Sequence, residues 1–200
     1  MPYGMQVANK LKQIRDMNLD IDMIAPAHGV IWRSYIPELL QAYEEFATFQ
    51  SVDKAVIVYE SVWKHTQMMA EALAEGMGRN GVCVKIFKCS MTSPAIIQKE
   101  LLDAKAILVG SGNYNNAMSG SIAAFLEKLI SCKVKNKKGL GFGSYGWANL
   151  VTKEINARLV KAGITLLNDE VVSQNYTPSE EDLDALMELG KQIAEEIKAM

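Results

Sequence analysis

From residue 54 onward the chain alternates between short apolar runs and longer segments in which apolar residues recur every three or four positions. The short runs are rich in β-branched residues, as in strands buried on both faces, and the longer segments have the spacing of amphipathic helices. Strands are expected at Ala55–Tyr59, Val82–Phe87, Ala106–Val109, Gly139–Gly143 and Thr165–Val172. Helices are expected at Gln67–Arg79, Ala95–Leu102, Ser119–Ser131 and Leu150–Ala162. This alternation predicts a parallel sheet with helices on both faces.

A further helix follows the last predicted strand. Thr177 is its expected N-cap, Pro178 its first helical residue and Glu180 the glutamate of a capping box. An apolar stripe then predicts a face that packs on the sheet, formed by Leu183, Leu186, Met187, Gly190, Ile193 and Ile197. Five strands in a short α/β chain predict a flavodoxin-like, three-layer α/β/α fold with a five-stranded parallel sheet of order 2-1-3-4-5. In such a sheet the ligand binds at the carboxyl ends of the strands, where the order reverses.

Residues 1–52 do not follow this alternation and are expected to be separate from a domain at 53–200. They predict a helix at Met5–Met17, a short strand at Ile21–Ala25 and a helix at Ile36–Phe49. So small a segment buries too little surface to close a core alone. It must dock on the next domain, pair with another copy or be part of a larger domain. A homodimer is a reasonable expectation, because several apolar side chains would lack a cover: Ile24, Val30, Ile31, Trp32 and Ile36.

Composition and charge exclude several classes of protein. The 200 residues carry a net charge of −2, and 49% are hydrophobic, which is typical of a soluble globular chain. The only basic run, Lys133–Lys138, is too short for a nucleic-acid-binding face. The first twenty residues contain no apolar core, so we expect neither a signal peptide nor a membrane span, and a cytoplasmic location. The three cysteines form no C-x-x-C pair and are expected to be reduced structural thiols.

Three loops that follow predicted strands carry the candidate chemistry. The first loop comes where a helix begins, so its amides and hydroxyls would suit a phosphate; it comprises Ser61, Val62, Trp63, Lys64, His65 and Thr66. The second loop, after the third strand, offers Gly112, Asn113, Tyr114, Asn115 and Asn116. The third, after the fourth strand, offers Ser144, Tyr145, Gly146 and Trp147. All three loops should lie at one edge of the sheet, where hydroxyls, amides and aromatic rings would meet.

This combination predicts a phosphorylated, planar and polar heterocycle, and flavin mononucleotide (FMN) has that anatomy. We assign the phosphate to the first loop and the ring to the other two, with Trp147 stacking on the ring and Tyr114 in contact with it. His65 either meets a phosphate oxygen or faces solvent. For Lys64 the same two alternatives stay open: direct contact with the phosphate, or an exposed side chain outside the loop. No catalytic residue is assigned. The second and third loops contain no carboxylate from Gly110 to Ser121 or from Gly139 to Thr152, which predicts weak electrostatic opposition to a reduced, anionic flavin.

A second motif, G-x-G-x-x-G at Gly141–Gly146, matches a dinucleotide-binding fingerprint, with Asp169 and Glu170 a little over twenty residues further on. Its first two glycines are expected inside the fourth strand rather than after the first strand. A dinucleotide site is therefore the weaker hypothesis.

The three loops resemble those of the flavodoxin-like domain of flavodiiron proteins (A-type flavoproteins). The resemblance covers the whole chain, since Met23–Arg33 is similar to the end of that family's metallo-β-lactamase-like domain. It implies that residues 1–52 are the remnant of that domain and that residues 53–200 bind FMN. It also implies electron transfer, with a small redox protein or reductase as the donor.

Two departures from the family limit what the resemblance implies. Lys64 stands where flavodoxin-type loops often have glycine, so a positive φ there would cost about 1 kcal/mol. The family's H-x-E-x-D-H motif has no counterpart, and His28, which matches its last iron ligand, is not a metal site by itself. No metal and no dioxygen or nitric-oxide reduction are therefore expected from this chain alone.

The leading hypothesis is an FMN-binding electron carrier. One alternative is an FMN-dependent NAD(P)H or quinone oxidoreductase on the same fold, which steady-state NAD(P)H oxidation would distinguish. A regulatory receiver domain is set aside, because the first strand ends in Tyr59-Glu60-Ser61 without the paired acids of a Mg²⁺ site.

Overall fold

The computed structural model describes residues 3–168 and 170–200, and the chain forms two compact units, Met1–Gln50 and Ser51–Met200. Within this described part, no helix combines the length and apolarity needed to cross a membrane.

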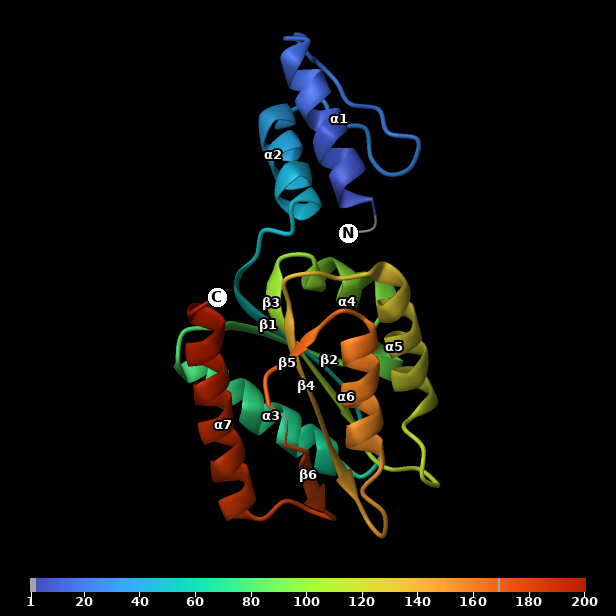
Figure 1. Cartoon of the computed structure of the whole chain (residues 1–200), viewed down its shortest axis with the longest axis vertical. Coiled ribbons are helices and arrows are strands. Elements are labelled where there is room, and N and C mark those ends of the chain that lie inside the picture. The colour runs from blue at the N-terminus through green and yellow to red at the C-terminus, as the bar shows by residue number, and fades with distance from the viewer. Residues whose placement is uncertain (1–2, 169) are drawn as a thin grey trace. The chain divides into compact units, whose positions relative to one another are not determined.

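Unit 2 is built on a parallel sheet whose strands run in the order β2-β1-β3-β4-β5 (Figure 1). At the centre, Ile57 pairs with Ile86 on one side and with Leu108 on the other. The predicted fold class and strand order are confirmed. The strands are β1 (Val52–Glu60), β2 (Cys83–Lys88), β3 (Ala104–Ser111), β4 (Lys138–Tyr145), β5 (Thr165–Leu166) and β6 (Val172–Asn175).

The predicted single strand at Thr165–Val172 is wrong, because β5 and β6 share that position beside β4. β5 pairs with Lys138 and Gly139, whereas β6 pairs with the other end of β4, from Phe142 to Tyr145. Between them the side chain of Asn168 accepts a hydrogen bond from the Glu170 amide at 2.9 Å. Asp169, named in the dinucleotide hypothesis, lies outside the described residues. The strand edge therefore extends to Asn175, three residues beyond the prediction.

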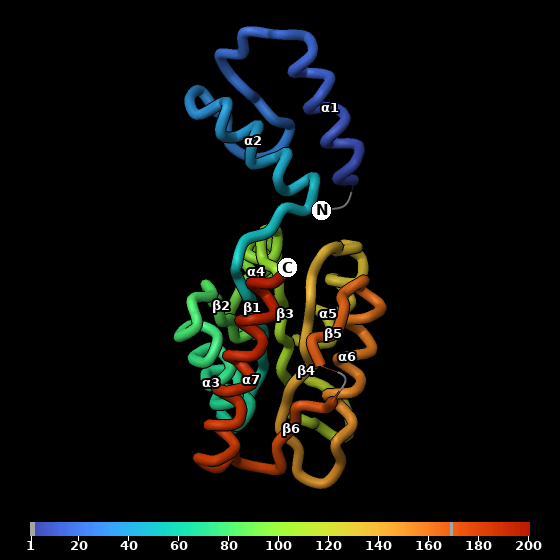
Figure 2. Tube along the Cα trace, turned by 60° about the vertical axis from the view of Figure 1, so that its left-hand side comes forward, coloured from blue at the N-terminus to red at the C-terminus, as the bar shows by residue number. Residues whose placement is uncertain are grey.

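Helices cover both faces of the sheet, as Figure 2 shows. α3 (His65–Arg79) and α7 (Glu180–Lys198) pack on one face, and α4 (Pro94–Leu101), α5 (Gly120–Cys132) and α6 (Val151–Lys161) pack on the other. A short 3₁₀ turn, η1 (Cys89–Met91), follows β2. Alternate β1 side chains enter the two cores, Ile57 with α3 and α7, and Val56 and Val58 with the opposite helices. Burial on both faces explains the unbroken apolar run that predicted this strand.

α7 begins two residues later than predicted. Its N-cap is Ser179, whose hydroxyl accepts a hydrogen bond from the Asp182 amide while the Asp182 carboxylate accepts one from the Ser179 amide. The capping box therefore involves Asp182 and not Glu180. Thr177 is not the cap, because its hydroxyl lies 3.0 Å from Nε2 of His65 and is engaged there. The predicted apolar stripe is confirmed, with Leu186, Ile193 and Ile197 buried.

Among the residues that the structure describes, two lysines are buried at the amino ends of the strands, and only Lys54 has carboxylate partners there. Nζ of Lys54 lies 2.7 Å from Oε2 of Glu100 and 2.8 Å from Oδ1 of Asp103. Lys137 is 6% exposed, and its Nζ donates to the backbone carbonyls of Ala104 at 2.5 Å and Leu102 at 3.3 Å. Burial lowers the pKa of Lys137 to about 8, against the opposing attraction of Asp103.

This depressed pKa predicts that unit 2 gains stability as pH rises from 7 to 9.5. Between a pKa of about 8 in the folded state and the ordinary value near 10.5, the unfolded chain binds more protons, so raising the pH favours folding. We expect the free energy of unfolding to rise by about 1–2 kcal/mol through this group. Urea denaturation of wild type and Lys137→Met at four pH values measures the effect. Parallel pH profiles for the two proteins would contradict it.

Unit 1 contains α1 (Gly4–Asp16) and α2 (Ile36–Ala47), which pack against each other and carry a 2.5 Å ion pair between Arg15 and Glu44. Both predicted helices are confirmed. The predicted strand at Ile21–Ala25 is wrong, because only Ile24 bridges to Trp32 in this segment. Ile36, expected to be exposed, is buried. A mainly apolar cavity of about 310 Å³ is lined by Leu11, Ile14, Ile21, Ile24, Pro26, Trp32, Leu39, Leu40 and Tyr43.

Candidate functional site

A cavity of about 250 Å³ opens at the carboxyl edge of the sheet in unit 2. The segments that follow β1, β3, β4 and β6 form its walls. It is lined by Ser61, Val62, Trp63, His65, Thr66, Gly112, Asn113, Tyr114, Ser144, Tyr145, Gly146, Trp147 and Tyr176. A second cavity of about 540 Å³ shares part of this wall and adds Asn115, Asn116 and Ala148. Three loops distant in sequence therefore meet at one place, as parallel topology requires.

The first loop forms the polar end of the cavity. α3 begins at His65, so the amides of its first turn lack intrahelical partners and carry partial positive charge. Ser61 and Thr66 are buried beside this helix start, 6% and 1% exposed. The Thr66 hydroxyl lies 3.1 Å from the Ser144 hydroxyl, which joins the first loop to the third. Helix-start amides with two or three hydroxyls form a site suited to a phosphate group.

The second loop is a tight turn whose conformation explains its two asparagines. The backbones of Tyr114 and Ala117 exchange two hydrogen bonds, at 2.8 and 3.0 Å. The residues between them, Asn115 and Asn116, have φ values of 50° and 64°, as in a type I′ turn. Asparagine tolerates this left-handed region better than most residues. The loop is tied to the third loop by the Asn113 amide, which donates to the Ser144 carbonyl at 3.1 Å.

Asn113 presents an unsatisfied acceptor within the cavity wall. Its Nδ2 donates to the carbonyl of Ala148, which fixes the orientation of the amide and leaves Oδ1 free. Among the side chains of residues 3–168 and 170–200, Oδ1 of Asn113 is the one buried polar atom without a hydrogen-bond partner. A buried unpaired oxygen costs about 1–3 kcal/mol, so a ligand that donates an N–H or O–H here would recover that cost. FMN carries such donors on its ring and its ribityl chain, so the residues present fit this group.

A fourth segment, Asn175–Thr177, completes the site, and none of its residues is among the fifteen predicted from the sequence. Nδ2 of Asn175 donates to the Gly146 carbonyl at 2.8 Å, and the Tyr176 amide donates to the Tyr145 carbonyl at 2.8 Å. Tyr176 thereby reaches the cavity wall, and the contact between Thr177 and His65 connects this segment to the first loop. Residues just after a strand of this sheet lie at the ligand edge, and that position is the sequence signal for this segment. Because the predicted strand ends at Val172 and β6 ends at Asn175, the prediction did not place Tyr176 and Thr177 directly after a strand.

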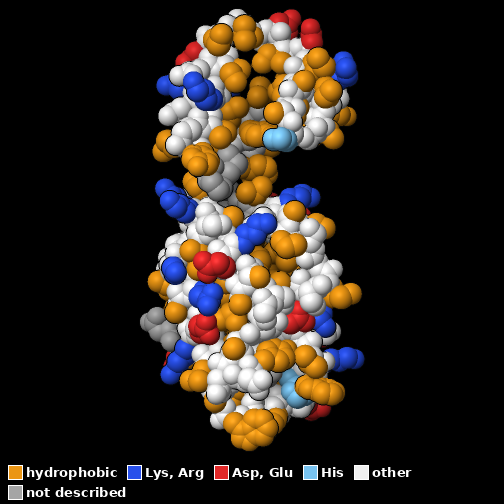
Figure 3. Space-filling view, turned by 90° about the vertical axis from the view of Figure 1, so that its right-hand side faces the viewer, with side chains coloured by type: hydrophobic (Ala, Val, Ile, Leu, Met, Phe, Trp, Pro, Cys, Tyr) orange, Lys and Arg blue, Asp and Glu red, His pale blue; other side chains and the backbone are white. Residues whose placement is uncertain are grey.

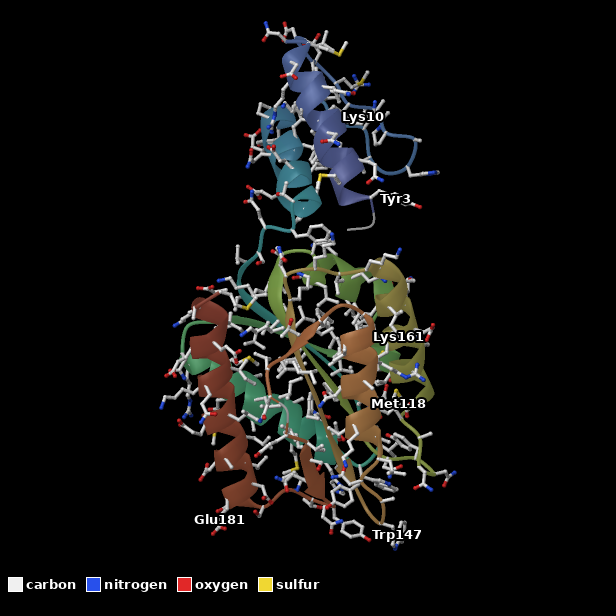
Figure 4. The ribbon with its side chains drawn as sticks, in the orientation of Figure 1. Tyr3, Lys10, Met118, Trp147, Lys161 and Glu181 are labelled. Carbon is white, nitrogen blue, oxygen red and sulfur yellow. The ribbon has the colours of Figure 1, made fainter. Side chains whose placement is uncertain are left out.

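Large aromatic side chains stand at the mouth of the cavity with little contact to the protein. Trp147 is 96% exposed and Trp63 is 80% exposed. Trp147 projects from the loop after β4 (Figure 4), and hydrophobic side chains lie at the surface at the bottom of this unit in the view of Figure 3. Exposed indole rings beside a polar cavity are suited to stacking on a planar ligand, which would contribute on the order of 1 kcal/mol per ring beyond burial.

Of the fifteen residues predicted to bind the cofactor, all but Lys64 line one of the two cavities. Asn115 and Asn116 line only the second one. Lys64 is exposed at the N-cap of α3, with φ 68° and ψ −6°. Lys64 therefore has the positive φ that would strain a residue other than glycine.

The glycines of the dinucleotide-like motif have a different structural role. Gly141 and Gly143 lie inside β4, as predicted. The Gly141 amide donates to Oδ1 of Asn156 at 2.7 Å, and a methyl group on Gly143 would lie 2.0 Å from the Ser111 carbonyl oxygen. Close packing of the strand accounts for both residues without a dinucleotide.

His28, which matches an iron ligand of the family but is not predicted to form a metal site by itself, is exposed between the bridged residues Ile24 and Trp32. In the described part of the chain, no group of three or more His, Cys, Asp or Glu side chains is placed to hold a metal ion.

We expect Lys64→Gly to raise the free energy of unfolding by about 0.5–1 kcal/mol. Glycine adopts the left-handed region without the steric cost that any other residue meets, and this gain exceeds its larger entropy in the unfolded chain. Lys64→Ala is the matched control, since it removes the same side chain but keeps the strain. Urea denaturation of both variants measures the difference. Equal stability of the glycine and alanine variants would show that the loop backbone carries no strain.

Comparisons with known proteins identify relatives and the same fold. The model of the flavodoxin family matches residues 57–190. The chain is 40% identical over 197 residues to a nitric oxide reductase of Moorella thermoacetica, which covers 98% of this chain and 49% of that protein. The chain spans about half the length of the curated relatives it matches.

Two solved structures share the fold. A rubredoxin oxygen:oxidoreductase of Desulfovibrio gigas superposes with a TM-score of 0.91 and 31% identity, covering 99% of this chain and 50% of that chain. A flavodoxin from the domain Archaea superposes with a TM-score of 0.66 and 32% identity, covering 72% of this chain and 99% of that one.

Proposed function

Because this chain belongs to the flavodoxin family and corresponds to the flavodoxin-like C-terminal part of flavodiiron proteins, we propose that its carboxyl-edge cavity binds FMN for electron transfer. The observation that carries this proposal is the meeting of a helix-start polar end, the unsatisfied Oδ1 of Asn113 and exposed indole rings around one cavity. FMN itself supplies one- and two-electron chemistry, and the protein binds, orients and tunes it.

Each part of the cavity has a proposed role. The first-turn amides of α3 and the hydroxyls of Ser61, Thr66 and Ser144 hold the phosphate. Oδ1 of Asn113 accepts a hydrogen bond from an N–H or O–H of the flavin. Trp63 and Trp147 exclude water from the ring faces, and the segment at Tyr176 supports the third loop. All fifteen residues predicted from the sequence stay candidates for cofactor contact, with Lys64 the one outside the cavity wall.

A direct test is addition of FMN to purified, flavin-free protein. We expect quenching of flavin fluorescence by the indole rings, a dissociation constant in the micromolar range or below, and flavin absorption bands that persist on dialysis. Riboflavin, which lacks the phosphate, should bind at least tenfold more weakly. A protein that stays colourless and leaves the FMN fluorescence unchanged would overturn the proposal.

The activities named for the relatives belong to proteins about twice as long. For this chain we propose only the electron-transfer part, with a small redox protein or a reductase as donor. Three free cysteines are consistent with a cytoplasmic, reducing compartment, which we also propose. Absence of steady-state NAD(P)H oxidation by the FMN-loaded protein, without added partners, is expected; rapid turnover would favour the alternative of an NAD(P)H or quinone oxidoreductase.

We further propose that unit 1 is the end of a larger, metallo-β-lactamase-like domain. Its apolar cavity and the exposed Val30 and Ile31 are suited to contact with the remainder of such a domain, and the relatives have the length to contain it. A second copy of this chain is the other candidate cover. Light scattering over a range of concentrations distinguishes them: a stable dimer that Val30→Glu dissociates would favour the second copy.

A further inference from the structure

A buried carboxylate, that of Glu60, lies at the end of β1 and has no role in the proposed FMN site so far. Glu60 is 8% exposed. Its Oε1 accepts from the Ser61 amide at 3.1 Å, and its Oε2 accepts from the Ser90 amide at 2.9 Å and the Ser121 hydroxyl at 3.1 Å. These partners come from the first loop, from η1 and from the first turn of α5. One side chain therefore connects the loop at the phosphate end to two other segments of the fold.

Glu60 is ionised in the folded protein. Burial works against the charge, but the hydrogen bonds from Ser90, Ser61 and Ser121 outweigh it and hold the pKa of Glu60 below its ordinary value. The facing cation is Lys88 on β2, whose Nζ lies 3.7 Å from Oε1 and whose side chain is 37% exposed. A partly solvated lysine at this distance neutralises the carboxylate only in part.

The charge lies next to the proposed flavin cavity. Glu60 lines a neighbouring groove of about 430 Å³ together with Val62 and Tyr114, and both of these also line the 250 Å³ cavity. Glu60 therefore lies in a groove that shares two wall residues with the site. The charge of Glu60 acts on one of these shared residues, since burial and then the charge of Glu60 raise the pKa of Tyr114, against a hydrogen bond from the Val62 backbone. Electrostatic effects are strong over short distances when water is excluded.

We propose that Glu60 is a positioning residue that sets the reduction potential of the bound flavin: it orders the first loop and places a fixed negative charge beside the ring. The proposal rests on the FMN site described above. Adding two electrons and one proton to a flavin ring adds one negative charge, which Glu60 opposes. The lack of carboxylates in the second and third loops by itself predicts weak opposition. The tertiary structure supplies the charge from the end of β1 instead.

The test compares the binding of oxidised and reduced FMN at pH 7.5. Anaerobic potentiometric titration, with dithionite as the electron donor and dye mediators, gives the ratio of the two dissociation constants, oxidised over reduced. In Glu60→Gln we expect this ratio to rise about tenfold, because reduced FMN no longer faces the charge. In Glu60→Asp, which keeps the charge, the ratio should stay within about twofold of wild type, although oxidised FMN binds more weakly through the loosened loop.

Two further variants keep the proposal open to refutation. Lys88→Met removes the cation that faces Glu60 and should lower the ratio about threefold, the opposite direction. Glu188→Gln on α7 removes an exposed carboxylate that pairs with Lys191 and should leave the ratio unchanged. If Glu60→Gln fails to fold, as judged by circular dichroism, the ratio measured in Lys88→Met tests the proposal: a lowered ratio supports it, and an unchanged or raised ratio contradicts it.

A ratio unchanged in folded Glu60→Gln, or shifted alike by Glu60→Gln and Lys88→Met, would overturn the proposal and leave Glu60 a purely structural residue. Such a result would leave the proposed function intact, because wild type would still bind oxidised FMN. Failure of wild type to bind oxidised FMN would instead refute the FMN site itself.

Discussion

Replacement of Gly76 by alanine is expected to lower the free energy of unfolding of unit 2 by about 3 kcal/mol. Gly76 on α3 faces Gly190 on α7, where the two helix backbones touch. A methyl group on Gly76 would lie 2.0 Å from the Met187 carbonyl oxygen, and one on Gly190 would lie 2.5 Å from that of Leu73. No rotamer change can relieve a clash between a β-carbon and backbone, so the helices must separate and the core between them must open.

Gly78 offers a matched control in the same helix. It is exposed, and nothing lies within 4 Å of the position of its missing β-carbon. Gly78→Ala should therefore raise stability by up to about 1 kcal/mol, through helix propensity alone. Urea denaturation followed by far-ultraviolet circular dichroism measures both variants. Similar effects of the two substitutions would contradict the close approach of α3 and α7.

Removal of the Thr66 hydroxyl is expected to weaken FMN binding about 10- to 150-fold. Thr66 is 1% exposed, and its hydroxyl meets that of Ser144 at the polar end of the cavity. In the proposed site this hydroxyl donates to the phosphate, and a hydrogen bond to a charged group contributes about 1.5–3 kcal/mol. Thr66→Val preserves the side-chain shape, so the core beneath α3 should stay intact. Fluorescence titration with FMN measures the loss.

Riboflavin and Thr66→Ser are the controls for this prediction. Riboflavin has no phosphate, so its weaker binding should be the same in wild type and Thr66→Val. Serine restores a hydroxyl and should recover most of the FMN affinity. Equal losses for riboflavin and FMN would mean that Thr66 supports the shape of the loop rather than the phosphate.

The layered fold was predictable because its signals are local. Each central strand is buried on both faces, so its residues form an unbroken apolar run, and each helix shows its sheet-facing side as a period of three to four residues. Such signals need only the residues of one element. The predicted element bounds are wrong where a contact with another segment determines the local structure. One case is the division of the last predicted strand into β5 and β6 beside β4, and the other is the start of α7, where Thr177 contacts His65.

The members of the candidate site were largely predictable for a topological reason. Once the strands are known to be parallel, the loops after them must gather at one edge, so residues as distant as Thr66 and Ser144 can be placed together without coordinates. The hydrogen bonds that these residues make were not predictable in the same way. That the amide of Asn113 is held by Ala148, leaving one oxygen unsatisfied, depends on contacts between two loops.

The sequence by itself determined the class of the fold, the strand order and the three loops of the candidate site, because periodicity and chain order are local properties. Only the tertiary structure decided which further groups face that site. It brought Tyr176 to the cavity wall and placed the charge of Glu60 in an adjoining groove, because burial, hydrogen bonding and electric fields depend on distances between residues far apart in the chain.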